Sequence, residues 1–164
     1  MQHAQPQSLI GRERELEQLE GGLADARAGH GSLFLVTGVP GIGKTFLAEA
    51  LSERANAEGM LTVWGRCWEN PGAPPYWPWV QVFRTIIRTT DDADLRHQLG
   101  AGAADIAQMV VELRETFGDL PPSREIESES ARFQLFDSAT AFLRRAAKAS
   151  PLSLRRGLAR RPLA

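Results

Sequence analysis

The sequence has little cysteine, little lysine and no long apolar run. Cys67 is its single cysteine, so no internal disulfide can form, and a reducing, cytoplasmic location is expected. No stretch of about 18 apolar residues occurs, so no membrane span is expected. The polar start from Met1 to Ser8 also lacks the apolar centre of a signal peptide. The 164 residues, 43% of them hydrophobic, suffice for one modest core or for part of a larger one.

Lysine is scarce and charge is unevenly distributed. Only Lys44 and Lys148 among the 19 basic residues are lysines, and this arginine bias is typical of a GC-rich coding sequence. All 20 acidic residues precede residue 138, so residues 138–164 carry basic charge alone. The basic residues of this segment either bind the phosphate backbone of a nucleic acid or have no evolved function, and we favour the second interpretation. Its basic residues are Arg144, Arg145, Lys148, Arg155, Arg156, Arg160 and Arg161.

The first half of the chain has the pattern of a strand, a loop, a helix and a second strand. A helical pattern that starts within residues 8–22 comes first, and the apolar run at residues 33–36 then predicts a strand buried on both faces. Residues 44–57 predict a helix, and residues 61–64 a second strand. This order is that of a βαβ unit, so the predicted fold class is α/β, with a parallel sheet flanked by helices.

The second half is predicted to be mainly helical. Four prolines within residues 70–78 exclude regular structure there. Apolar spacing then predicts helices over residues 79–88, 103–117 and 129–148. The predicted organisation is a disordered start over residues 1–7, a domain over residues 8–150 and an irregular basic tail over residues 151–164.

One motif carries clear chemistry: Gly38-Val39-Pro40-Gly41-Ile42-Gly43-Lys44-Thr45 matches G-x-x-x-x-G-K-[ST] in full. The glycines let the backbone curl so that successive N–H groups form a concave anion site. The following helix start also favours phosphate. Lys44 is predicted to contact the β- and γ-phosphates of ATP, and the Thr45 hydroxyl to hold Mg²⁺.

The segment Leu9-Ile10-Gly11-Arg12-Glu13-Arg14-Glu15 ahead of this P-loop resembles the opening of bacterial STAND-type, AAA-related ATPase modules, which begin many large LuxR-type transcriptional regulators. The resemblance implies that Leu9 and Ile10 pack on the adenine and that Arg12 and Glu13 lie near the base or ribose. A second interpretation makes Leu9 and Ile10 core contacts and gives Arg12 and Glu13 a role in starting a helix.

The resemblance implies a P-loop core in which ATP acts as a switch that controls assembly and output, through self-association or C-terminal effector domains. The acid that should follow a second apolar strand and hold Mg²⁺ is not recognisable, so the core is predicted to be incomplete and hydrolysis to be weak. Asp91-Asp92 lies in a polar context that does not fit this role. The alternatives are a small-molecule P-loop kinase and a nucleic-acid-binding module that uses the basic tail.

Tyr76, Trp77 and Trp79 form an aromatic cluster next to the prolines. It is interpreted either as a recognition surface or as a rigid lid packed against the sheet, and we favour the lid because large aromatic side chains are mostly buried. Cys67 is interpreted as a small core residue rather than a nucleophile.

The first prediction is that residues 153–163 are read in the wrong frame. Read one base later, codons permitted by this sequence give Leu-Phe-Val-Val-Val-Leu-Leu-Asp-Asp-Leu, a buried strand that ends in two acids. The gene's DNA checks this prediction. An alternative frame without an apolar run ending in Asp-Asp, or one with an immediate stop codon, would exclude it.

Overall fold

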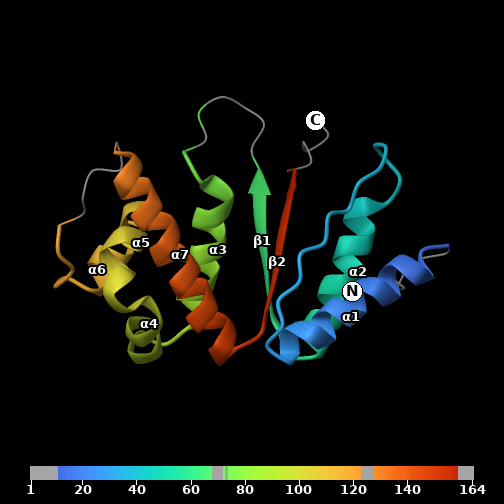
Figure 1. Ribbon diagram of the computed structural model, residues 1–164, viewed down its shortest axis with the longest axis horizontal. Helices are drawn as coiled ribbons and strands as arrows, with labels where there is room; N and C mark the ends of the chain where they lie inside the picture. The colour runs from blue at the N-terminus through green and yellow to red at the C-terminus, as the bar shows by residue number, and fades with distance from the viewer. Residues whose placement is uncertain (1–10, 68–71, 73, 123–127, 159–164) are drawn as a thin grey trace, which may run out of the picture.

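A computed structural model describes residues 11–67, 72, 74–122 and 128–158. Helices lie on both sides of a two-stranded parallel sheet, with α1 and α2 on one side and α3 to α7 on the other (Figure 1). The elements are α1 (Glu13–Arg27), α2 (Lys44–Ala57), β1 (Leu61–Cys67), α3 (Trp77–Thr89), α4 (Asp92–Leu99), the 3-10 helix η1 (Gly100–Gly102), α5 (Ala103–Met109), α6 (Leu113–Thr116), α7 (Glu129–Ala149) and β2 (Leu152–Leu158).

The sheet joins two strands that lie far apart in the sequence. β1 and β2 pair in parallel, in a register that runs from Leu61 opposite Leu152 to Cys67 opposite Leu158. The α/β class and the parallel sheet are thus confirmed. The irregular tail expected from residue 151 onwards is wrong for residues 152–158, because the edge of β1 supplies hydrogen-bond partners for this segment despite its basic composition.

The strand predicted at residues 33–36 is not formed. The segment is extended but unpaired, and the side chains of Leu33 and Leu35 are 96% and 88% exposed. Phe34 alone has a close neighbour on α1, since a Cβ placed on Gly22 would lie 2.3 Å from its ring. An apolar run becomes a strand only where a neighbouring edge satisfies its backbone, and no described segment pairs with this one.

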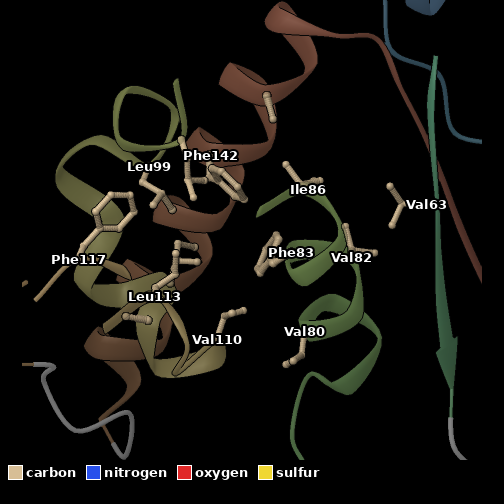
Figure 2. Packing of buried hydrophobic residues seen from close by; sticks show 14 residues of the cluster. Val63, Val80, Val82, Phe83, Ile86, Leu99, Val110, Leu113, Phe117 and Phe142 are labelled. Atoms are coloured by element: carbon tan, nitrogen blue, oxygen red, sulfur yellow. The ribbon is translucent and has the colours of Figure 1, made fainter. Parts of the chain in front are cut away.

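Helix α3 lies at the centre of the main core (Figure 2). Its first turn approaches β1 so closely that a Cβ on Gly65 would lie 2.7 Å from the carbonyl oxygen of Pro78. On its far side Phe83 meets Phe142 of α7 edge to face, with ring centroids 5.6 Å apart. Burial of Val63 from β1 and Leu113 from α6 in the same cluster ties the helical side of the molecule to the sheet.

Helix boundaries follow the predicted pattern in part. Helix α2 covers the predicted residues 44–57, and α7 matches its predicted range to within a residue. The single helix predicted over residues 103–117 is instead α5 and α6, separated at Val110, whose backbone leaves the helical region with φ −124° and ψ 85°. No helix in the described ranges has the length and apolarity needed to cross a membrane.

On the other side of the sheet, α1 and α2 pack through small apolar clusters. Leu16 and Leu19 of α1 contact Leu47 of α2, while Leu23 lies with Ala55. Ion pairs between Arg54 and Glu20 and between Arg27 and Glu58 flank these contacts. The candidate site lies at the amino-terminal ends of these two helices.

The guanidinium nitrogens of Arg155 are buried near α2, although the residue as a whole is partly exposed. Its guanidinium lies 3.6 Å from the ring centroid of Trp64, its register partner on β1. None of its three nitrogens has a hydrogen-bond partner within the described part of the chain. Desolvation lowers the pKa of Arg155 to about 10, against the opposing effect of Glu49 on α2. A guanidinium so placed destabilises the strand that carries it.

We therefore expect Arg155→Leu to stabilise the protein. Removing a buried and unpartnered charge from an apolar interface should raise the free energy of unfolding by about 1 kcal/mol. Urea unfolding measures the effect. The control is Arg156→Leu on the opposite, exposed face of β2, which should change stability by less than about 0.5 kcal/mol. Equal or lower stability of Arg155→Leu would contradict the account.

Candidate functional site

The segment from Gly38 to Gly43 forms a tight loop that leads directly into α2. Gly38, Gly41 and Gly43 have φ values of 145°, 83° and 92°, in a region that residues with a side chain rarely adopt. A Cβ on Gly38 would also lie 3.1 Å from Cγ2 of Ile42. The spacing of glycines in the motif therefore corresponds to the positions where this curl requires them.

Lys44, the first residue of α2, folds its side chain back over this loop. Its Nζ donates to the carbonyl oxygens of Gly38 at 2.8 Å and of Val39 at 3.0 Å. The ammonium group is thus held above the loop rather than extended into solvent. Thr45 follows in the first turn of α2 and is partly exposed.

The start of α2 is suited to a negatively charged group. The first bond of its ladder runs from the N–H of Leu47 to the carbonyl of Gly43 at 2.9 Å, so the preceding N–H groups have no intrahelical partner. No acidic side chain lies in the first turn. The positive end of the helix dipole is therefore not compensated by the chain itself.

Arg12 connects the start of α1 to the same loop. Its Nη1 donates to Oε1 of Glu15 at 2.7 Å, and its Nη2 to the carbonyl oxygen of Ile42 at 3.4 Å. The hydrogen bond from Arg12, followed by that from its own backbone, lowers the pKa of Glu15. The contact between Arg12 and Ile42 joins two residues 30 positions apart.

Glu13 has a separate role at the start of α1. Its Oε1 accepts a hydrogen bond at 3.0 Å from the N–H of Gly11, and bonds from its own N–H and that of Gly11 lower its pKa. This contact is of the kind expected for a helix-starting residue. Leu9 and Ile10, the predicted adenine contacts, lie outside the described residues.

The sequence analysis gave no role to Glu15, which holds the guanidinium of Arg12. The available signal was spacing, because residues three apart on a helix lie on neighbouring parts of its surface. Arg12, which caps the start of α1, and Glu15 in its first turn form such a pair of opposite charge. A search for charge pairs around the Gly-Arg-Glu segment would have found it.

The other residues considered from the sequence have structural contacts. Asp91 caps α4, since its Oδ1 accepts from the N–H of Asp94 at 3.0 Å. Cys67 is partly buried at the end of β1, and its Sγ accepts from Nε of Arg156 at 3.4 Å. These contacts lie away from the loop of Gly38 to Gly43. No group of three or more potential metal-binding side chains occurs within the described ranges.

The aromatic side chains of Tyr76, Trp77 and Trp79 differ in how far they are buried. Trp77 packs against the main core, whereas Trp79 is 39% exposed. Tyr76 has a φ of 62° and meets Phe136 of α7 edge to face, with ring centroids 5.6 Å apart. The segment is thus the first turn of α3 on the sheet, as the lid interpretation expects for Trp77 but not for Trp79.

A cavity of about 360 Å³ lies at the amino ends of the two strands, lined in part by Leu61, Leu152 and Gln98. The loop before α2 lies beyond the opposite end of that helix, which at 14 residues spans about 21 Å. The cavity and the loop are therefore separate features.

The donors around the loop fit a nucleotide with a phosphate chain. A lysine ammonium, uncompensated N–H groups at a helix start and glycines that admit a close approach all favour phosphate oxygens. Mg²⁺ accompanies nucleotides in such sites because its charge offsets that of the phosphates, and the hydroxyl of Thr45 is a ligand that it accepts.

Comparison with known proteins agrees with this chemistry. No curated protein and no solved structure shows significant similarity to the chain. A family model described as "AAA ATPase domain" matches residues 8–154, a range that holds the loop, both helices beside it and the first residues of β2. On this match the chain belongs to the AAA ATPase domain family, a family of nucleotide-binding ATPase domains.

Proposed function

We propose that the chain binds MgATP through residues Gly38 to Thr45, as the nucleotide-binding part of a regulatory STAND-type ATPase module. Lys44 would contact the β- and γ-phosphates, and the hydroxyl of Thr45 would hold Mg²⁺. The observation that carries the proposal is the position of Lys44, whose Nζ lies 2.8 Å and 3.0 Å from two carbonyl oxygens of a loop curled by its glycines. The regulatory part rests on the resemblance of the Gly-Arg-Glu segment.

The position of Lys44 also indicates which contacts the nucleotide would replace on binding. The ammonium of Lys44 already donates to two carbonyl oxygens of the loop, so at these donors phosphate oxygens would replace carbonyl oxygens rather than water. A charge-assisted bond to phosphate is stronger than one to a neutral carbonyl. The side chain of Lys44 would therefore lose little conformational entropy on binding, and this favours affinity for the nucleotide.

The nucleic-acid alternative is less well supported. Of the seven basic residues at the end of the chain, Arg145 donates to the carbonyl oxygens of Gln98 and Leu99, Arg155 is buried against Trp64, and Arg156 contacts Cys67. Arg145 and Arg155 are therefore not available as phosphate contacts, and Arg156, although exposed, is bonded to Cys67. We therefore do not expect direct nucleic-acid binding.

The end of β2 is relevant to the Mg²⁺-binding acid that is not recognisable in the sequence. The family match stops at residue 154, next to the buried and unpartnered Arg155. The two acids of the alternative reading frame fall at codons 160 and 161, just beyond Leu158, where β2 ends. Both features support the alternative frame, which would supply a carboxylate for Mg²⁺ at the carboxyl edge of the sheet.

The first test concerns affinity. We expect Lys44→Ala to weaken MgATP binding at least tenfold, about 1.4 kcal/mol, because it removes the phosphate contact. Titration calorimetry measures the affinity. Lys148→Ala, the matched control at the only other lysine, should leave it unchanged. Equal affinity of the wild type and a folded Lys44→Ala would contradict the proposal.

The second test concerns turnover. We expect hydrolysis by this chain to stay near background, because the loop and Lys44 position phosphates but supply only part of the transition-state stabilisation. Phosphate release from ATP measures the rate. A chain translated in the alternative frame from codon 153 should hydrolyse ATP faster. A steady rate of about 1 s⁻¹ from the present chain, abolished by Lys44→Ala, would mean that an acid has been overlooked.

A further inference from the structure

We propose that Arg12 is a positioning residue, which holds the P-loop in its phosphate-binding conformation by fixing the carbonyl group of Ile42. This inference rests on the proposed function and assigns Arg12 a role in the geometry of the loop. The resemblance implies a different role, a contact with the base or ribose. The two roles lead to different dependence on the ligand, which makes them separable.

The guanidinium is anchored before it reaches the loop. Nη1 of Arg12 lies 2.7 Å from Oε1 of Glu15, one turn further along α1. That carboxylate orients the guanidinium, whose Nη2 donates to the carbonyl oxygen of Ile42 at 3.4 Å. Arg12 itself precedes α1, so the loop is tied to a helix that Leu16 and Leu19 pack against α2.

The carbonyl of Ile42 is the point where such a tie has most effect. Ile42 lies between Gly41 and Gly43, which both have positive φ values and a wide choice of backbone conformations. Its C=O group and the N–H of Gly43 belong to one planar trans peptide and point in opposite directions. A hydrogen bond that holds the carbonyl towards Arg12 therefore turns the N–H of Gly43 away from Arg12. In the sequence this N–H directly precedes the free N–H groups in the first turn of α2.

Charge alone does not account for this arrangement. Glu15 offsets the positive charge of Arg12 at short range, so the pair attracts phosphate weakly compared with Lys44. If Arg12 acted by attraction, removing the charge of Glu15 would strengthen phosphate binding. If Arg12 acts by position, the same change replaces a charged acceptor by a neutral one, loosens the guanidinium and weakens binding.

The experiment uses the full chain with two ligands, MgATP and inorganic tripolyphosphate with Mg²⁺, the second of which has neither base nor ribose. We expect Arg12→Ala and Glu15→Gln to weaken the binding of both by about threefold or more, the effect of losing one hydrogen bond. Arg12→Lys, which keeps the charge but lacks the fork, should behave in the same way. The matched controls are Arg14→Ala and Glu17→Gln, exposed positions on the same helix, which should leave both affinities unchanged.

A second measurement needs no ligand. Hydrogen exchange at the amides of Gly41, Gly43 and Lys44 should be faster in Arg12→Ala than in the wild type, while exchange in the α7 helix stays the same. This readout separates failure of the inference from failure of the proposed function, which the Lys44→Ala titration tests.

Three results would overturn the inference. Weaker MgATP binding with unchanged tripolyphosphate binding would place Arg12 at the base or ribose. Tighter binding by Glu15→Gln would show an effect of charge. Unchanged affinities and unchanged exchange in Arg12→Ala would leave Arg12 without a role in the loop.

Discussion

Phe83 and Phe142 meet edge to face at the centre of the largest apolar cluster, where α3 contacts α7. The opposite side of α3 lies on β1, closely enough to require a glycine at residue 65. Helix α3 therefore makes the largest contact between the sheet and the helices α4 to α7. Among the described residues the other side has no comparable core, and α1 and α2 meet through a few leucines and exposed ion pairs.

This difference matters for the site. The loop of Gly38 to Gly43 belongs to the side with the smaller apolar contacts, so its conformation depends more on backbone geometry and on polar contacts than on packing. Surface ion pairs contribute little individually. The two side chains that reach the loop, Lys44 and Arg12, therefore have more influence on its shape than they would have in a densely packed region.

Local patterns were sufficient to predict α2 and α7 and the conformation of the loop glycines. Both helices have apolar residues at helical spacing along their length, and Gly43, in a left-handed conformation, marks the start of α2. Local patterns failed to predict the structure of segments that depend on pairing with a strand distant in the sequence. Leu33 to Val36 has the composition of a strand but pairs with no described strand, whereas residues 152–158 have a basic composition but pair with β1. The P-loop and Lys44 could be read from the motif, but the bond from Arg12 to Ile42 spans 30 residues and follows from the packing of α1 on α2.

The edge of β2 away from β1 is unpaired within the described residues, and the extended apolar segment of Leu33 to Val36 is exposed on the same side of the molecule (Figure 1). An open strand edge close to exposed apolar side chains is a template for pairing with another polypeptide. Chains of this sequence are therefore expected to aggregate through strand pairing as their concentration rises. Conditions that cover apolar surface should protect them better than conditions that strengthen their helices.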